Sequence, residues 1–160
     1  MQKGVTLIEM LVVVAIVTIL ASAVMPLSRM TVKRTKEIVL RGNLRVLRKA
    51  IDDFKWDCDN KKLSTVEGYC KADQNNYPES LEQLTEPVKM AGALDKTKKY
   101  LRRIPRDTMM PLESSDKTNN WGLRSYSDLP DSTEWGGGNV YDVFSKNQSI
   151  SLDGSKYNTW

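Results

Sequence analysis

The sequence predicts an α+β fold in which a long N-terminal helix, half membrane-spanning and half amphipathic, packs on a small antiparallel β-sheet. Three observations predict it: an apolar run over residues 5–27, a stripe of apolar residues at helical spacing after it, and two aromatic and β-branched segments near the C-terminal end. A length of 160 residues with a formal net charge of +4 fits one domain behind a membrane segment.

The apolar run is long enough to cross a bilayer. Residues 5–27 contain Glu9 as their only charge, and a helix that rises about 1.5 Å per residue spans roughly 35 Å over that length. The competing interpretation is a cleavable secretory signal, for which Ala21-Ser22-Ala23 resembles a cleavage site. Such signals have apolar cores of about 7 to 15 residues. The length therefore favours a transmembrane helix over residues 5–28.

The helix is predicted to continue through residues 29–56. Pro26 predicts a kink and Gly42 weakens a helix, but no Pro or Gly pair interrupts residues 28–56. Apolar residues then recur in steps of four and three, which places them on one helix face. They are Leu40, Leu44, Leu47, Ile51 and Phe54. This face is expected to pack on the soluble part of the chain.

Residues 57–160 are predicted to form a loop-rich α+β region. Residues 79–85 are compatible with a short helix. Residues 121–127 and 139–145 are predicted strands, separated by a polar loop with three consecutive glycines. A third strand is predicted over residues 149–152 from their alternating pattern. Together these strands would form the sheet on which the helix lies.

Composition excludes much chemistry. With no histidine, the chain lacks the usual zinc sites and the Ser-His and Cys-His nucleophile pairs. Two cysteines are too few for a thiolate zinc site. These absences favour a protein that is not an enzyme.

Charge is concentrated beside the apolar run. Residues 29–49 hold eight basic groups and one acid, whereas residues 50–160 hold 15 basic and 18 acidic groups. We interpret the basic stretch as a solvated helix face, with lipid headgroups or nucleic acid as the alternative contacts. The eight residues are Arg29, Lys33, Arg34, Lys36, Arg41, Arg45, Arg48 and Lys49.

Glu9 is an unexpected charge within the apolar run, because placing an unpaired carboxylate in a bilayer costs about 3 kcal/mol or more of free energy. It either lies at the membrane edge, where it reaches water, or has a partner. Its neighbours, Gly4-Val5-Thr6-Leu7-Ile8-Glu9-Met10-Leu11, resemble the class III signal of type IV pilins and type II secretion pseudopilins. The spacings from Gly4 to Glu9 and to Pro26 agree with that family. Val5 stands where the family most often has phenylalanine.

The resemblance implies a processing and assembly mechanism. Residues 1–4 would be a leader that a prepilin peptidase removes after Gly4, and the new amine of Val5 would be methylated. Glu9 would pair with the N-terminus of a neighbouring subunit in a helical filament. The family's partners are an inner-membrane assembly platform with its ATPase and minor pseudopilins. The implied location is the bacterial inner membrane, single-pass, with the C-terminal region in the periplasm, although the positive-inside rule alone predicts the opposite orientation.

The soluble part resembles the major pseudopilin of type II secretion systems in the order of its landmarks. They are Asn76-Tyr77-Pro78, residues 81–84, Tyr100-Leu101, Ile104-Pro105, Asp107, Trp121-Gly122, residues 141–145, Asp153-Gly154 and Trp160. This resemblance implies a periplasmic pseudopilus that drives protein secretion. It also makes Asp142, Ser145 and Asp153 candidate calcium ligands. In the oxidising periplasm Cys58 and Cys70 would form a disulfide, with two free thiols as the alternative.

Two other functions are compatible with the sequence. One is a type IV or competence pilin that serves adhesion, motility or DNA binding, although nucleic-acid binding is not expected because neighbouring subunits or lipid would cover the basic stretch. The other is a membrane-anchored enzyme, for which the composition offers little support.

Overall fold

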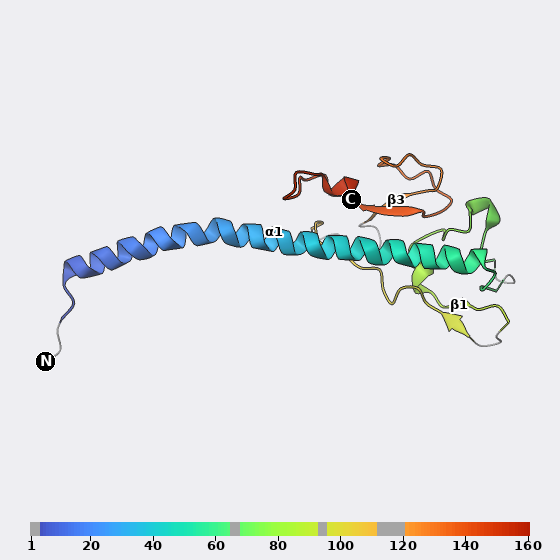
Figure 1. The fold of residues 1–160 in the computed structure, drawn as a ribbon, viewed down its shortest axis with the longest axis horizontal. Coiled ribbons are helices and arrows are strands. Elements are labelled where there is room, and N and C mark those ends of the chain that lie inside the picture. Colours follow the sequence, from blue (N-terminus) through green and yellow to red (C-terminus); the bar gives the residue numbers. More distant parts are fainter. Residues whose placement is uncertain (1–3, 65–67, 93–95, 112–120) are drawn as a thin grey trace. The chain divides into compact units, whose positions relative to one another are not determined.

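A single helix dominates the fold. The computed structural model describes residues 4–64, 68–92, 96–111 and 121–160 (Figure 1). Helix α1 (Leu7–Asp59) has 53 residues and continues through Pro26 and Gly42, so the prediction of one long helix is confirmed. Packing divides the chain into two units, Met1–Lys36 and Glu37–Trp160. The first part of α1 belongs to one unit and the second part to the other.

The first unit exposes its apolar side chains. Leu7 is 82 % exposed, Ile8 71 % and Leu20 64 %, and the most apolar stretch of α1 has no buried residue. By length and composition, α1 is able to cross a membrane. Because exposed apolar surface is unfavourable in water, this part of the helix needs lipid or another protein around it.

The second unit has one hydrophobic core, built on residues 37–59 of α1. The predicted stripe is buried, with Leu40, Leu47, Ile51 and Phe54 at 0 % exposure. Residues from the rest of the unit complete this core; they include Leu63, Leu81, Leu84, Val88, Leu101, Trp121, Val140, Val143 and Tyr157. The amphipathic assignment of residues 29–56 thus holds where the helix meets the core.

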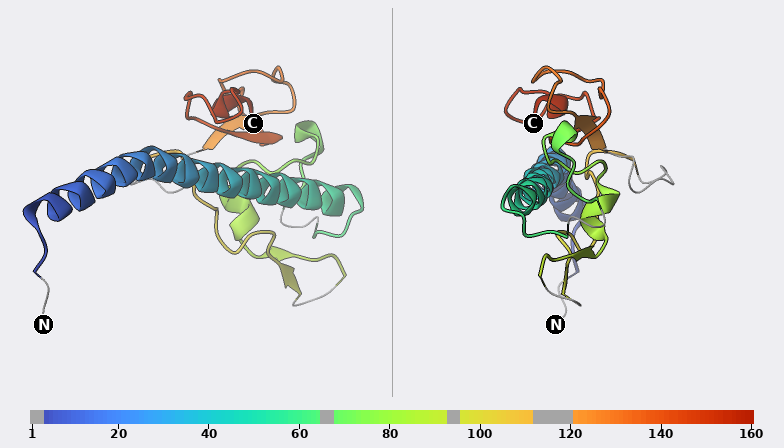
Figure 2. Two further views of the ribbon diagram at one scale, coloured as in Figure 1. Left: turned by 60° about the vertical axis from the view of Figure 1, so that its left-hand side comes forward. Right: turned by 90° about the vertical axis from the view of Figure 1, so that its right-hand side faces the viewer.

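Two small antiparallel sheets flank this part of α1 (Figures 1 and 2). Strand β3 (Trp121–Arg124) pairs with β4 (Asp142–Ser145), within the two predicted strand segments. Strand β1 (Val88–Lys89) pairs with β2 (Thr97–Lys98), a pair too short to produce a sequence signal. The 3-10 helix η2 (Glu82–Thr85) occupies only part of the predicted helix at residues 79–85.

The predicted third strand at residues 149–152 is wrong. Only Ile150 forms an isolated bridge, to Lys156, and the segment continues into a turn instead of joining β4. The Asp153 carboxylate accepts hydrogen bonds from Ser155 N–H and from the Ser151 and Ser155 hydroxyls. Such local side-chain bonds satisfy the backbone without a ladder. Two further 3-10 helices, η1 (Ala72–Gln74) and η3 (Tyr157–Thr159), complete the secondary structure of the described residues.

Gly122 is required by the packing of β3 on β4. A Cβ atom at Gly122 would lie 2.2 Å from the ring of Phe144, its register partner on β4. The Arg124 guanidinium lies 4.2 Å from the centroid of the same ring. The phenyl ring is therefore held between a glycine backbone and a cation.

Candidate functional site

The predicted cleavage point lies just ahead of α1. Gly4 and Val5 precede the first helical residue, Leu7, and both are exposed, with Val5 65 % exposed. The peptide bond between them therefore lies outside the hydrogen-bonded helix. A solvent-exposed peptide bond outside regular secondary structure is the kind of site that a peptidase can bind.

Thr6 caps the helix, a role that the sequence analysis missed. Its Oγ1 accepts a hydrogen bond from the Glu9 backbone N–H at 3.3 Å, and its carbonyl accepts one from Met10 N–H at 3.2 Å. The available signal was the Thr-x-x-Glu spacing of a capping box. Glu9 stands out by its charge within an apolar run, and that criterion does not include its spacing from Thr6.

Glu9 consequently lies in the first turn of α1. The positive end of the helix dipole partly compensates a carboxylate there. Glu9 is exposed, so the carboxylate is available to a cation from another chain. The other predicted assembly residue, Pro26, lies within α1, 17 residues further on and about 26 Å along the helix axis. Glu9 and Pro26 are not brought together.

A disulfide joins the end of α1 to the following loop. Cys58 and Cys70 are bonded, with their Cα atoms 5.5 Å apart, and Cys58 is buried at 6 % exposure. The predicted disulfide is confirmed. It fixes a polar excursion of the chain against the last turn of the helix.

Asp57 anchors the same end of α1 electrostatically. It is 2 % exposed, and its carboxylate accepts hydrogen bonds from Lys98 Nζ and, at 2.8 Å, from the Tyr100 hydroxyl. Burial alone would raise the pKa of Asp57, but the bonds from Lys98 and Tyr100 outweigh it and lower the pKa. Burial of the Tyr100 side chain, together with its hydrogen bond to Asp57, raises the pKa of Tyr100.

Two arginines hold Asp142, one of the predicted calcium ligands. Arg48 Nε, from α1, lies 2.7 Å from Asp142 Oδ1, and Arg124 Nη1, from β3, lies 3.2 Å from Oδ2. Arg48 also donates to the carbonyls of Val143 and Trp160, at 3.1 and 2.9 Å. We call Arg48, Arg124 and Asp142 the arginine clamp. It links the helix, the β3–β4 sheet and the C-terminal residues.

The other two predicted ligands are also engaged. The Ser145 hydroxyl donates to the carboxylate of Asp107, which is fully buried. Asp153 accepts from Arg41 as well as from its own turn. Hydrogen bonds from the Ser151 and Ser155 hydroxyls, then from Ser155 N–H and Arg41, hold the pKa of Asp153 well below its usual range.

These residues do not fit a calcium ion. Calcium requires about six to eight oxygen ligands, yet guanidinium groups occupy the carboxylates of Asp142 and Asp153. Within the described ranges, the structure brings together no group of three His, Cys, Asp or Glu residues that could hold a metal ion. Each of the three predicted ligands is instead held by another described side chain.

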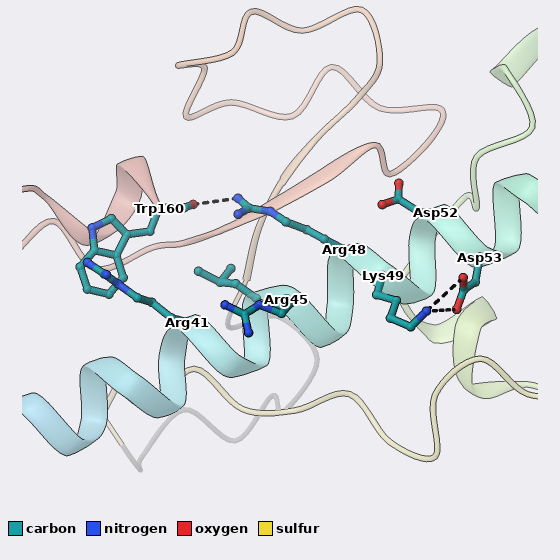
Figure 3. A pocket seen from close by; sticks show the side chains of 8 residues that line it. Arg41, Arg45, Arg48, Lys49, Asp52, Asp53 and Trp160 are labelled. Atoms are coloured by element: carbon teal, nitrogen blue, oxygen red, sulfur yellow. Dashed lines mark hydrogen bonds and ion pairs between the residues drawn. The ribbon is translucent and has the colours of Figure 1, made fainter.

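An open pocket of about 670 Å³ lies along the basic face of α1 in the second unit (Figure 3). We call it the basic groove. Its lining includes the buried Leu44 and the indole of Trp160, over which the Arg41 guanidinium stacks at 4.0 Å. Arg45 points into it without a described hydrogen bond, ion pair or ring contact in the part of the chain that the structure covers. The remaining lining residues are Arg48, Lys49, Asp52 and Asp53.

Comparison with known proteins supports the N-terminal assignment. Residues 1–25 match the family described as the prokaryotic N-terminal methylation motif. The matched segment holds Gly4, Val5 and Glu9. It indicates a prepilin-type processing signal of the kind found in type IV pilin-like proteins. No curated protein and no solved structure gives a significant match to the chain.

Proposed function

We propose that this protein is a non-enzymatic structural subunit of a periplasmic pseudopilus that drives type II protein secretion. It polymerises through its N-terminal helix. The observation that carries the proposal is the methylation motif at residues 1–25, which coincides with an apolar helix that has no buried residue in its most apolar stretch.

The exposed apolar helix has two environments that suit it. In a bilayer, lipid tails cover side chains such as Leu7, Leu11 and Leu20. In a filament, the helices of neighbouring copies cover them instead. Both states remove apolar surface from water at roughly 25 cal/mol per Å². A subunit can therefore be stored in the membrane and transferred to a filament with little change in its hydrophobic stabilisation.

Cleavage supplies the electrostatic part of the mechanism. Hydrolysis of the Gly4–Val5 bond leaves a carboxylate on the leader and an amine on Val5, which a peptidase methylates with a methyl group from a sulfonium donor. Within a helix bundle that amine is a cation in a medium of low dielectric constant. Pairing with Glu9 of an adjacent copy neutralises both charges, whereas a mismatched stagger leaves both uncompensated. The pairing thus selects one axial register.

Support for the secretion branch comes from the second unit. Several landmark residues of the resemblance are core residues, including Tyr77, Leu101, Trp121 and Val143. The disulfide lies at the end of α1 and does not enclose the C-terminal region, where adhesive pilins more often carry a disulfide-bounded loop. These features favour a pseudopilin over an adhesive pilin.

Intact-mass analysis of the membrane-extracted protein, combined with deletion of its gene, tests this function. We expect loss of residues 1–4, gain of one methyl group, and accumulation of secreted proteins inside the deletion strain. Gly4→Leu should leave the precursor uncut and fail to restore secretion. An unprocessed wild-type chain, or normal secretion in the deletion strain, would contradict the proposal.

A further inference from the structure

The basic groove has an unsatisfied cationic end. Arg41 forms an ion pair with Asp153, and Lys49 Nζ lies 3.3 Å from Asp53 Oδ2. Arg45 lies between them on an exposed helix surface, and no described residue pairs with it. The half-buried ring of Trp160 and the buried Leu44 line the pocket beside this cation. The combination suits a ligand that carries an apolar side chain flanked by carboxylates.

The loop between β3 and β4 carries such a group. Leu129 is 77 % exposed, the highest value among the described large apolar side chains of the second unit. Asp131 and Glu134 follow it, both exposed, and no residue that the structure describes forms an ion pair with either carboxylate. We call residues 128–135 the acidic loop. Its sequence is Asp-Leu-Pro-Asp-Ser-Thr-Glu-Trp.

The acidic loop is held in one conformation by its own hydrogen bonds. Asp128 accepts from Ser125 N–H at 2.7 Å and from Gly136 N–H at 3.0 Å. Arg124 Nε donates to the carbonyl of Ser132 at 2.8 Å. The indole N–H of Trp135 donates to the carbonyl of Asn139 at 2.9 Å. Because the loop is ordered before binding, little conformational entropy is lost when it docks.

We infer that the acidic loop of one copy of this chain docks into the basic groove of the next copy. Leu129 enters beside Leu44 and Trp160, and Asp131 and Glu134 face Arg45 and the adjacent cations. This inference rests on the proposed function, because polymerisation brings the copies together. Helix packing raises their effective concentration, so a small contact is sufficient.

The two surfaces share no residue, which determines the symmetry of the contact. A groove that binds a different surface of its partner forms a heterologous contact, and repetition of such a contact gives an open helical filament. A self-complementary contact would instead close a dimer. The inferred contact is therefore of the type that a filament requires.

Cysteine cross-linking between two marked copies tests the contact without changing its charges. Gly42 lies on the same row of α1 as Arg45 and Lys49, and a Cβ added there meets no atom within 4 Å. Thr133 is exposed in the acidic loop. The full-length variants Gly42→Cys and Thr133→Cys, co-expressed with the assembly system and oxidised, should give a cross-linked dimer. Either variant alone should give little, and Glu82→Cys, exposed on η2, serves as the control partner.

Charge reversal then tests the electrostatic pairing. Adding Arg45→Glu to the Gly42→Cys copy should lower the cross-linked fraction about tenfold, because like charges then face each other. Adding Glu134→Arg to the Thr133→Cys copy should restore it. A strong cross-link in Gly42→Cys alone, no loss with Arg45→Glu, or cross-linking of Gly42→Cys only to a different protein would each overturn the inference.

The outcome separates this inference from the proposed function. Filaments and secretion without the mixed cross-link would overturn the inference and leave the function in place. A mixed, charge-dependent cross-link from a strain whose secretion does not need the protein would support the contact and overturn the secretion role.

Discussion

Arg48 on α1 and Asp142 at the start of β4 are separated by 94 residues in the sequence, yet their side chains form an ion pair at 2.7 Å. The same guanidinium reaches the carbonyls of Val143 and Trp160. One helical side chain therefore fixes two separate parts of the C-terminal region. We therefore expect the stability of that region to depend on this side chain.

Replacing Arg48 tests this dependence. We expect Arg48→Met to lower the free energy of unfolding by about 2 kcal/mol, because Asp142 loses a partly buried charged donor and two carbonyls lose their bonds. Arg45→Met, one turn away and exposed, is the matched control and should change it by less than about 0.5 kcal/mol. Urea unfolding of the detergent-solubilised full chain, followed by tryptophan fluorescence, measures both. Equal effects would show that the arginine clamp carries no special stabilisation.

Removal of divalent cations should leave the fold unchanged. Guanidinium groups already neutralise Asp142 and Asp153, so we expect the same melting temperature with calcium and with a chelator. Protease resistance of the C-terminal region should also be the same in both. A chelator-induced drop in melting temperature that calcium alone reverses would show that a calcium site forms after all.

The role of Glu9 is tested by separating its charge from its size. Glu9→Gln keeps the shape of the side chain but loses its charge, and we expect membrane insertion and cleavage after Gly4 to persist while filament yield falls about tenfold or more. Glu9→Asp, which retains the charge, should keep part of the yield. Counting filaments by electron microscopy, with intact mass as the check on processing, gives the answer. Normal filaments from Glu9→Gln would rule out pairing through this carboxylate.

Asp57 should make the second unit sensitive to acid. Because its pKa is lowered in the folded protein, its stabilisation is complete above its unfolded value of about 3.9 and is lost as the pH falls toward the folded value. Melting temperatures of wild type should therefore fall more steeply below about pH 5 than those of Asp57→Asn, which has no charge to lose. Parallel curves for the two proteins would indicate that Asp57 is not coupled to folding.

Features with a local or periodic signal were predictable from the sequence. The apolar stripe from Leu40 to Phe54 predicted the buried face of α1, and the composition of residues 121–127 and 139–145 located β3 and β4. The signal around Gly4 and Glu9 predicted the N-terminal methylation motif that residues 1–25 match, because its spacing is contained within a few residues. Each of these predictions depends on neighbours along the chain.

Features that depend on distant partners were not predictable. Asp142 and Asp153 read as calcium ligands because the sequence does not reveal that Arg48 and Arg41 lie beside them. The alternating residues 149–152 read as a strand, since the pattern does not include the competing bonds to Asp153. Strands β1 and β2 have two residues each, which is too short for an alternating pattern to be seen in the sequence.

The cap at Thr6 determines how many non-helical residues would remain ahead of α1 after the proposed cleavage. Since the helix begins at Leu7, after the predicted cut behind Gly4, the proposed cleavage would remove no helical residue. In the proposed mechanism, the new amino group of Val5 would be joined to the helix through a linker of one to two residues, about 7 Å at full extension. So short a linker would let the amine reach only its immediate surroundings, and a subunit would have to be nearly aligned with its neighbour before the proposed pair with Glu9 forms.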